Sequence, residues 1–202
     1  MNGEQTQPGC PFSADDNPCP LDAYGVSKHE AEEGLLLLAS ETGMEVVIIR
    51  PPLIYGPGVK ANFYTMMRLL YGSLPLPFGA IYNQRSLASL DNLIDLVIIC
   101  IEHPAAANQV FLVSDGEDLS TTELLQHVAN ALGKNALLLP INQKLLEYVL
   151  SLFGKKGLSQ KLCGSLQVDI SKAKKLLNWE PSVSVDEGLQ KTAQHFLEHQ
   201  PK

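Results

Sequence analysis

The sequence predicts an α/β fold, because helical and strand patterns alternate along the whole 202-residue chain. The clearest strand is the run at residues 46–49. It is apolar, rich in β-branched residues and directly preceded by a helical pattern, as buried parallel strands often are. The composition agrees with a globular chain, since 45% of the residues are hydrophobic and 18% are charged. A chain of this length can bury a substantial core.

Residues 1–22 are predicted to form a loop, because they contain four prolines and two glycines. A helix is expected over residues 23–42, with Asp22 at its N-cap and Gly43 at its C-cap. The four leucines at positions 35–38 predict that the far end of this helix is buried.

A strand over residues 44–50 follows this helix and ends at two prolines, and residues 54–58 then form a turn-rich loop. Helices are expected at residues 61–72, 91–103, 120–132, 142–153, 171–177 and 184–199. Strands or extended segments are expected at residues 109–113, 136–139 and 166–169. Residues 73–80 are expected to be an extended loop, and residues 154–165 a mobile loop rich in glycine and lysine. Ser120 and Glu123 have the spacing of a capping box.

Charge and cysteine content exclude several kinds of partner. The formal net charge is −7 and no basic cluster exceeds three residues, so nucleic-acid binding has no electrostatic support. The four cysteines form no C-x-x-C pair, which favours free thiols in a cytoplasmic protein. The first residues lack the apolar core of a signal peptide, and no apolar run is long enough to span a membrane. Neither a nucleic acid nor a membrane is therefore an expected partner.

No metal site is expected. His195 and His199 have the four-residue spacing of a metal-binding pair, but no third ligand is in view, so they are interpreted as a solvated helix end. The Ser-Asp-Gly sequence at residues 114–116 is interpreted as a turn. Trp179, between Leu177 and a proline, is interpreted as a core residue.

Tyr24 and Lys28 are the sharpest chemical feature of the sequence. Residues four apart on a helix lie on one face, one turn from each other. The hydroxyl of a tyrosine has an ordinary pKa of about 10, and a nearby ammonium favours the phenolate and lowers that pKa. A phenol tuned in this way can take a proton from a sugar hydroxyl while a hydride leaves the same carbon. Tyrosine and lysine at this spacing also occur on ordinary solvated helices, so the surrounding sequence must decide.

The surrounding sequence resembles a known family. The segments PLDAYGVSKHEAE and VVIIRPPLIYGPG together match the pattern Y-G-x-S-K followed, about two dozen residues later, by R-P-x-x-x-Y-G-P. This compound pattern resembles the extended short-chain dehydrogenase/reductases of the NAD-dependent epimerase/dehydratase family, and among them the UDP-sugar 4-epimerases and UDP-N-acetylhexosamine 4-dehydrogenases. The resemblance covers essentially the whole chain, because it continues at residues 62–63, 76–79, 85–86, 91–93 and 177–181.

The resemblance implies roles for eight residues. Tyr24 would be the catalytic base, and Lys28 would be its partner and hold a ribose of NAD. Pro51 and Leu53 would lie beside the nicotinamide. The substrate side would consist of Asn62 and Arg85 at the diphosphate of a UDP-sugar and Leu76 and Phe78 at the uracil. Family members usually have a later, second arginine on the phosphates, which this chain lacks; Lys161 would replace it only as a point charge.

Part of the family pattern is absent from these 202 residues. The cofactor fingerprint G-x-x-G-x-x-G does not occur, and neither does the Ser or Thr that usually assists the catalytic tyrosine. The chain is therefore expected to begin inside the family's nucleotide-binding domain. Residues 1–58 would be the C-terminal remnant of that Rossmann-like domain, and residues 59–202 the smaller α/β domain that binds the nucleotide sugar.

The expected function is NAD-dependent epimerisation at C4 of a UDP-sugar, in a chain that is truncated and inactive alone. Two alternatives stay open: a nucleotide-sugar 4-reductase or dehydratase, and a non-catalytic fragment that binds a nucleotide sugar or a partner. The resemblance also implies a homodimer formed through the helix that carries Tyr24 and Lys28, with apolar contacts from Ala31 and residues 35–38.

Overall fold

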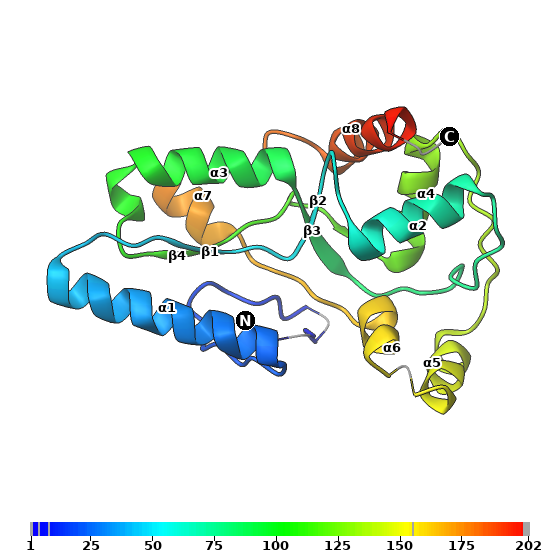
Figure 1. Cartoon of the computed structure of the whole chain (residues 1–202), viewed down its shortest axis with the longest axis horizontal. Helices are drawn as coiled ribbons and strands as arrows, with labels where there is room; N and C mark the ends of the chain where they lie inside the picture. The colour runs from blue at the N-terminus through cyan, green and yellow to red at the C-terminus, as the bar shows by residue number, and fades with distance from the viewer. Residues whose placement is uncertain (1, 4, 8, 155, 200–202) are drawn as a thin grey trace.

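The fold is that of a computed structural model, which describes residues 2–3, 5–7, 9–154 and 156–199. Its elements form two groups along the long axis of the molecule (Figure 1). One end contains a two-stranded sheet with helices on both sides, and the other contains a three-stranded sheet with the remaining helices. The predicted α/β class is confirmed.

Helix α1 (Ala23–Thr42) begins and ends where the sequence predicts. The side chain of Asp22 accepts a hydrogen bond from the amide of Gly25 at 2.6 Å, and Gly43 takes a left-handed φ of 73° at the C-cap. The prediction of a buried far end is wrong, because the leucines at positions 35–38 are 42–61% exposed. A run of leucines reveals an apolar surface, but it does not reveal whether another element covers that surface.

The two-stranded sheet pairs β1 (Ile48–Arg50) with β4 (Val110–Leu112) in parallel, with Ile48 opposite Val110. Helix α3 (Leu90–Glu102), followed by the 3₁₀ turn η1 (Pro104–Ala106), leads into β4. In the view of Figure 1, α3 runs on one side of this strand pair and α1 on the other.

The core at this end is built around the strand pair. Phe111 of β4 packs with Leu96 of α3 and with Leu177 of helix α7 (Ser171–Leu177). Trp179 is 1% exposed and donates its indole N–H to Asp95 at 2.9 Å, so the predicted core role of Trp179 is confirmed.

The three-stranded sheet was not expected from the sequence. Strand β2 (Leu53–Tyr55) pairs in parallel with β3 (Arg85–Ser89), and β3 pairs antiparallel with β5 (Asp118–Leu119). The interpretation of residues 54–58 as a turn-rich loop therefore misses the end of β2. Such short strands, bounded by prolines and glycines, have too few residues to display a periodicity.

Three helices cover this second sheet: α2 (Ala61–Tyr71), α4 (Thr121–Ala131) and α8 (Val185–Glu198). The predicted capping box of Ser120 and Glu123 is present at the start of α4, and α8 begins with a second one. The shared core includes Tyr55, Phe63, Met67, Leu125, Val128, Leu189 and Phe196.

Helices α5 (Gln143–Leu152) and α6 (Lys156–Cys163) form a hairpin at the edge of the molecule. The expectation of a mobile loop over residues 154–165 is wrong for α6, and residue 155 lies outside the described residues. Cys163 and Leu162 pack with Leu146 of α5 in a small third core, which explains why a segment rich in glycine and lysine is helical.

The described part of the chain also bears on membrane spans, metal sites and disulfides. None of its helices is long and apolar enough to cross a membrane. It contains no group of three His, Cys, Asp or Glu side chains that could hold a metal ion. All four cysteines are free, Cys10 and Cys19 at the surface and Cys100 and Cys163 buried.

Candidate functional site

Tyr24 and Lys28 stand together on the first turns of α1, as their spacing predicts. The ammonium of Lys28 lies 5.6 Å from the centre of the Tyr24 ring. Tyr24 is 71% exposed, so its hydroxyl is accessible from outside. The geometry is therefore compatible with a tyrosine that exchanges a proton with a bound molecule.

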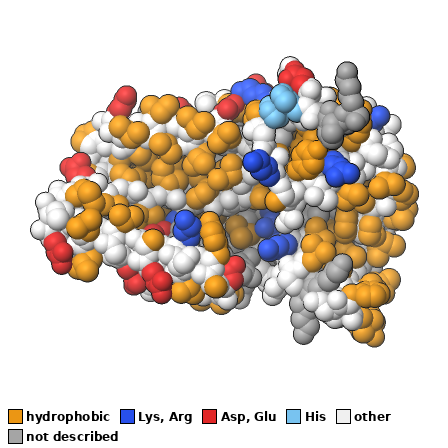
Figure 2. Space-filling view, in the orientation of Figure 1, with side chains coloured by type: hydrophobic (Ala, Val, Ile, Leu, Met, Phe, Trp, Pro, Cys, Tyr) orange, Lys and Arg blue, Asp and Glu red, His pale blue; other side chains and the backbone are white. Residues whose placement is uncertain are grey.

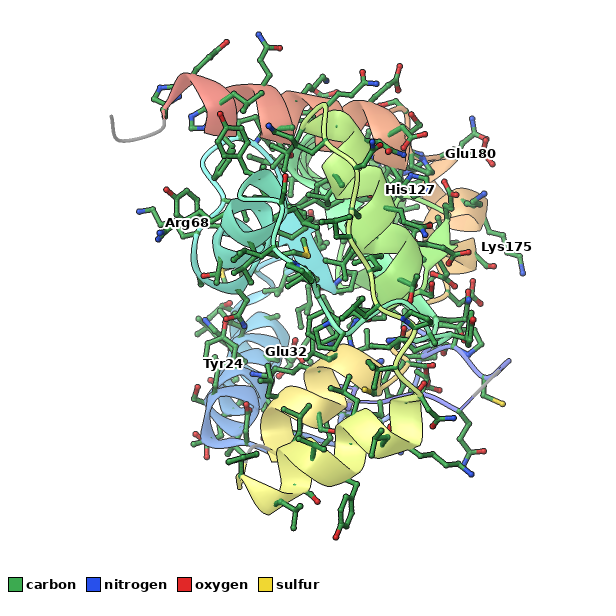
Figure 3. The ribbon with its side chains drawn as sticks, turned by 90° about the vertical axis from the view of Figure 1, so that its right-hand side faces the viewer. Tyr24, Glu32, Arg68, His127, Lys175 and Glu180 are labelled. Atoms are coloured by element: carbon green, nitrogen blue, oxygen red, sulfur yellow. The ribbon has the colours of Figure 1, made fainter. Side chains whose placement is uncertain are left out.

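Glu32 fixes the orientation of this helix. It is four residues beyond Lys28 and eight beyond Tyr24, so the three residues follow one another at intervals of about one helical turn; Figure 3 labels Tyr24 and Glu32 on this helix. Glu32 is buried, and both of its carboxylate oxygens bind the guanidinium of Arg50 at the end of β1, the shortest contact being 2.7 Å. Arg50 also donates to the amide oxygen of Asn2 at 2.7 Å. This bidentate pair attaches α1 to the strand that leads to Pro51.

Sequence reasoning did not identify Glu32 or the structural role of Arg50. The signal that could have revealed them is the combination of a glutamate in the middle of the helix and a single arginine in the strand that follows. A buried carboxylate at Glu32 needs a cation, and the only arginine of the following strand is Arg50.

Pro51 and Leu53 lie where the chain passes from one sheet to the other. Arg50 ends β1, and Leu53 begins β2 two residues after Pro51. Both Pro51 and Leu53 are exposed, Leu53 by 42%. They are therefore accessible to a ligand, as the expectation of a nicotinamide contact requires.

Asn62 is exposed on the first turn of α2, and this helix start has an unusual geometry. The N-cap residue Lys60 makes no side-chain capping hydrogen bond. Ala61 takes a φ of 55°, which costs energy for a residue with a Cβ atom. First-turn amides without a side-chain cap can bind an anion, which suits the expectation of a diphosphate near Asn62.

Leu76 and Phe78 belong to a loop that pairs with residues 137–139. The amide of Leu76 donates to the carbonyl of Leu137 at 2.9 Å, and Leu76 is buried in the core. Phe78 is half-buried and packs against two core clusters. The side chain of Leu76 thus packs in the core, whereas part of the Phe78 side chain remains accessible to a ligand.

Arg85 is half-buried on β3 rather than free at the surface. Its Nη1 donates to the carbonyls of Lys161 and Gly164, each at 3.0 Å. Within the described part of the chain, Nη1 makes all of the hydrogen bonds of this guanidinium. The N–H groups of Nε and Nη2 can therefore donate to a ligand. Burial lowers the pKa of Arg85, although a guanidinium remains charged at neutral pH.

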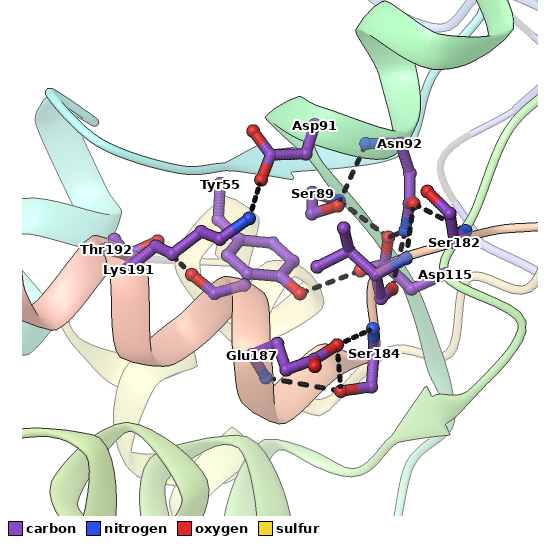
Figure 4. Close-up of polar contacts among 12 residues, drawn as sticks. Tyr55, Ser89, Asp91, Asn92, Asp115, Ser182, Ser184, Glu187, Lys191 and Thr192 are labelled. Carbon is purple, nitrogen blue, oxygen red and sulfur yellow. Dashed lines mark hydrogen bonds and ion pairs between the residues drawn. The ribbon is translucent and has the colours of Figure 1, made fainter.

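A buried polar network was missed by the sequence interpretation. Asp115, which was assigned to a turn, is 7% exposed and accepts hydrogen bonds from the Tyr55 hydroxyl at 2.8 Å and the Ser89 amide at 2.8 Å (Figure 4). Asn92 also donates to Asp115 at 2.7 Å and to the carbonyl of Val183 at 2.8 Å. The network joins the end of β2 to the starts of α3 and α8. The turn itself is confirmed by Gly116, with a φ of 79°.

We expect Tyr55→Phe to destabilise the protein by about 1–2 kcal/mol at neutral pH, because it removes a buried hydrogen bond to a carboxylate. Burial raises the pKa of Tyr55 far above its ordinary value of 10.0, and Asp115 raises it further. The unfolded chain therefore ionises Tyr55 above pH 10.0 while the folded chain does not, and this contribution to stability is complete below pH 10.0 and declines above it. Urea unfolding between about pH 8 and pH 11 should give a shallower loss of stability for Tyr55→Phe than for the unmodified chain.

Tyr82→Phe is the matched control, because Tyr82 is 79% exposed. This variant should keep both the neutral stability and the alkaline slope. The same alkaline slope in Tyr55→Phe and in the unmodified chain would contradict the role assigned to the buried phenol.

The structure also contains two surface hollows. One, of about 610 Å³, lies between α5 and α6 and is bordered by Gln5; the other, of about 350 Å³, lies between α2 and α8. Neither is lined by any of the eight residues predicted for the site. In the second hollow the rings of His195 and His199 stack with centres 4.1 Å apart, and His195 Nδ1 accepts from the amide of Gly58. Because that contact uses one of the two ring nitrogens of His195, it supports the interpretation of these histidines as a helix end rather than as a metal-binding pair.

Known proteins resemble this chain over most of its length. A family model described as "NAD dependent epimerase/dehydratase family" matches residues 2–114. A Vibrio cholerae protein named UDP-glucose 4-epimerase is 53% identical over 199 residues, which cover 98% of this chain and 61% of that protein. An Escherichia coli O157:H7 protein named N-acetyl-alpha-D-glucosaminyl-diphospho-ditrans,octacis-undecaprenol 4-epimerase is 27% identical over 197 residues, covering 91% of this chain and 59% of that protein.

Among solved structures, UDP-glucose 4-epimerase of Thermotoga maritima with UDP-glucose superposes with a TM-score of 0.73 at 22% identity, covering 98% of this chain and 60% of that one. This likeness supports the fold. The chain spans less than two thirds of the length of each of these relatives.

Proposed function

Because the chain belongs to the NAD dependent epimerase/dehydratase family, we propose that it supplies the proton-transfer residues and the sugar-nucleotide side of an epimerase that acts at C4 of a UDP-sugar. The observation that carries this proposal is the pair Tyr24 and Lys28 on α1, held in orientation by Glu32 and Arg50. The Vibrio cholerae relative, at 53% identity, has a name that fits the same chemistry.

In this mechanism, Tyr24 removes the proton from the 4-hydroxyl of the sugar as the C4–H bond breaks. Lys28, on the next turn of the helix, is the cation beside this phenol and would hold the ribose of the cofactor. After the 4-keto sugar turns over in the site, Tyr24 returns the proton to the oxygen, and C4 has the opposite configuration. A bound NAD, held by Lys28 at its ribose and by Pro51 and Leu53 beside its nicotinamide, would supply the hydride acceptor for C4 and the hydride donor to its opposite face.

The described residues fit only one side of NAD. Tyr24, Lys28, Pro51 and Leu53 are accessible and suit the nicotinamide and its ribose. The pyrophosphate needs a glycine-rich turn at a helix start, and no G-x-x-G-x-x-G occurs in the 202 residues. We therefore assign residues 1–58 to the cofactor side and residues 59–202 to the substrate side of the functional site.

On the substrate side, the uncapped start of α2 at Asn62 and the guanidinium of Arg85 would bind the diphosphate, with Leu76 shaping the loop and Phe78 against the uracil. This assignment is supported by the free donors at the start of α2 and on Arg85. The names of the Vibrio cholerae and Escherichia coli relatives share a sugar attached to a diphosphate. A sugar diphosphate is thus the part of the ligand that the names of these two relatives have in common.

We expect Arg85→Lys to weaken UDP binding by about 1–3 kcal/mol, because a lysine cannot reproduce the charge-assisted hydrogen bonds of the fork. The protein to use is a chimera of this chain with the part of the Vibrio cholerae relative outside the match, and the measurement is calorimetric titration with UDP. Arg68→Lys is the control, since Arg68 is an exposed arginine on α2. Equal affinities for Arg85→Lys and the unmodified chimera would remove Arg85 from the diphosphate site.

Product analysis of the same chimera with UDP-glucose, UDP-N-acetylglucosamine and dTDP-glucose tests the proposed reaction. An epimerase converts a UDP-sugar to its C4 epimer, whereas a dehydratase accumulates a 4-keto-6-deoxy sugar and a reductase consumes reduced cofactor. If none of the three substrates changes while NAD is bound, the proposed function is wrong.

A second candidate is a chain that binds a nucleotide sugar without catalysis, because the start of α2 and the guanidinium of Arg85 offer hydrogen-bond donors without requiring NAD. We expect residues 1–202 alone to bind NAD too weakly to detect at micromolar concentrations, since the contacts to half of the cofactor are missing. Tight binding of NAD by the isolated chain in a calorimetric titration would contradict this expectation.

We further propose that α1 pairs with the same helix of a second copy. The proposal is supported by the exposure of its outer leucines at positions 35–38. Leu37→Glu should then shift the sedimentation coefficient of the chain towards that of a monomer. A chain that is already monomeric at about tens of micromolar would refute a dimer of useful affinity.

A further inference from the structure

The α5–α6 hairpin carries an apolar surface that the proposed site does not use. This surface, here called the hairpin patch, combines six exposed hydrophobic side chains, of which Phe153 is 75% and Leu152 is 67% exposed. Figure 2 shows hydrophobic side chains gathered at the lower right, where Figure 1 places α5. The patch consists of Leu145, Tyr148, Val149, Leu152, Phe153 and Leu158.

The hairpin has two distinct apolar faces. Leu146 is buried beside Ile81 and Cys163, and Leu150 packs against the same cluster, so the inner face attaches α5 to the protein. The patch residues Leu145 and Leu152 are seven apart on the helix, with Tyr148 and Val149 between them, and form a continuous outer stripe. The inner face is explained by folding, whereas no described element covers the outer one.

The local charge separates this patch from the other exposed apolar faces. Residues 143–163 contain four lysines and one glutamate, a formal charge of +3 in a chain whose net charge is −7. Helix α3 also exposes large hydrophobic side chains, among them Ile98 and Ile101, but it contains three acidic residues and no lysine or arginine. Helix α1 contains four glutamates and one lysine. Of these three helical surfaces in the described part of the chain, the hairpin patch is the one that combines an apolar stripe with positive charge.

An apolar stripe flanked by lysines is the pattern of a helix that lies at the surface of an anionic bilayer. Lysine stems extend along apolar surfaces while their ammonium groups reach phosphates, and a tyrosine suits the boundary between lipid tails and headgroups. Helix α5 has 10 residues, about half of what a span requires, so it can lie on a membrane but cannot cross it.

We propose that the hairpin patch docks this protein on the surface of an anionic phospholipid bilayer. Leu152, Phe153 and their neighbours enter the headgroup boundary, and the exposed Lys144 and Lys161 contact lipid phosphates. The inference is independent of the proposed reaction, because it uses no residue of the proposed site. It revises the sequence-based expectation that a membrane is not a partner, although the expectation that no segment spans one is unchanged.

Co-sedimentation of the full chain with vesicles tests the proposal. Vesicles with about one quarter phosphatidylglycerol in phosphatidylcholine should bind the chain at least tenfold more tightly than pure phosphatidylcholine, and salt should weaken that binding. Leu152→Glu/Phe153→Glu should reduce the binding about tenfold or more. Ile98→Glu/Ile101→Glu on α3 is the matched control, with the same added charge, and should bind like the unmodified chain.

A fluorescence measurement distinguishes entry of the patch into lipid from sedimentation that aggregation of the protein would cause. Phe153→Trp places an indole in the patch, and the native Trp179 is buried, so its emission stays constant. A blue shift of the new emission on adding phosphatidylglycerol vesicles supports docking through the patch. Equal vesicle binding by the patch variant and the unmodified chain would overturn the proposal. So would patch-dependent self-association without vesicle binding, which would assign the surface to a second copy.

Discussion

Glu32→Ala is expected to lower the free energy of unfolding by about 3–5 kcal/mol, because it leaves the guanidinium of Arg50 buried without its carboxylate partner. In the folded chain both oxygens of Glu32 bind Arg50, and both side chains are at most 10% exposed. A loss of this size is a large fraction of the 5–15 kcal/mol that stabilises a typical domain. Urea denaturation followed by circular dichroism gives the change directly.

The loss should be concentrated in α1. Gly25 and Glu32 are the buried residues of this helix, so without the ion pair the helix should open before the rest of the fold. Amide hydrogen exchange should therefore accelerate most over residues 23–42. The double variant Glu32→Leu/Arg50→Met should regain part of the stability, since an apolar pair can replace a buried ion pair.

Glu30→Ala is the matched control for this prediction. Glu30 is exposed on the same helix, and its replacement should change the stability by no more than about 0.5 kcal/mol. If Glu32→Ala is as stable as Glu30→Ala, then the ion pair does not hold α1 in place, and the orientation of Tyr24 must have another cause.

The second large effect is expected on catalysis. Tyr24→Phe in the chimera with the cofactor-binding part of the relative should lower kcat about 10²–10⁴-fold, because it removes the group that carries the proton. The KM for the UDP-sugar should change much less, since the diphosphate and uracil contacts come from other residues. Tyr82→Phe, at a comparably exposed tyrosine, should keep the full rate. A Tyr24→Phe variant with undiminished kcat would assign the proton transfer to another group.

Lys28→Met adds a second arm to this measurement. Lys28 lies 5.6 Å from the Tyr24 ring, and in the proposed mechanism it also holds the ribose of NAD. This variant should therefore bind NAD more weakly and have a lower kcat. A structural role alone would leave the affinity of the folded chimera for NAD unchanged.

The sequence predicted those features that depend on local patterns. The caps of α1 at Asp22 and Gly43, and the capping box of α4, follow from residue types at fixed spacings and were placed correctly. The pairing of Tyr24 with Lys28 is likewise a property of one helix. Such features need no knowledge of distant parts of the chain.

The features that were missed depend on contacts between distant segments. Asp115 looks like part of an ordinary turn until Tyr55 and Asn92, 60 and 23 residues away, donate to it. The backbone contacts of Arg85 were missed as well, because the carbonyls of Lys161 and Gly164 that accept from its Nη1 belong to a segment expected to be a mobile loop. The burial of a side chain also depends on distant segments and cannot be predicted from local sequence, since the leucines at positions 35–38 of α1 are apolar but exposed in the fold.

An isotope measurement on the chimera tests the central claim most directly, namely that Tyr24 on α1 serves epimerisation at C4. UDP-glucose carrying deuterium at C4 is incubated with the protein and NAD, and the products are analysed by NMR. The account predicts UDP-galactose that retains deuterium at C4, with Tyr24→Phe forming it at least about a hundredfold more slowly. Deuterium transferred to C6 of a 4-keto-6-deoxy sugar, or no turnover by a folded chimera that binds NAD, would contradict it.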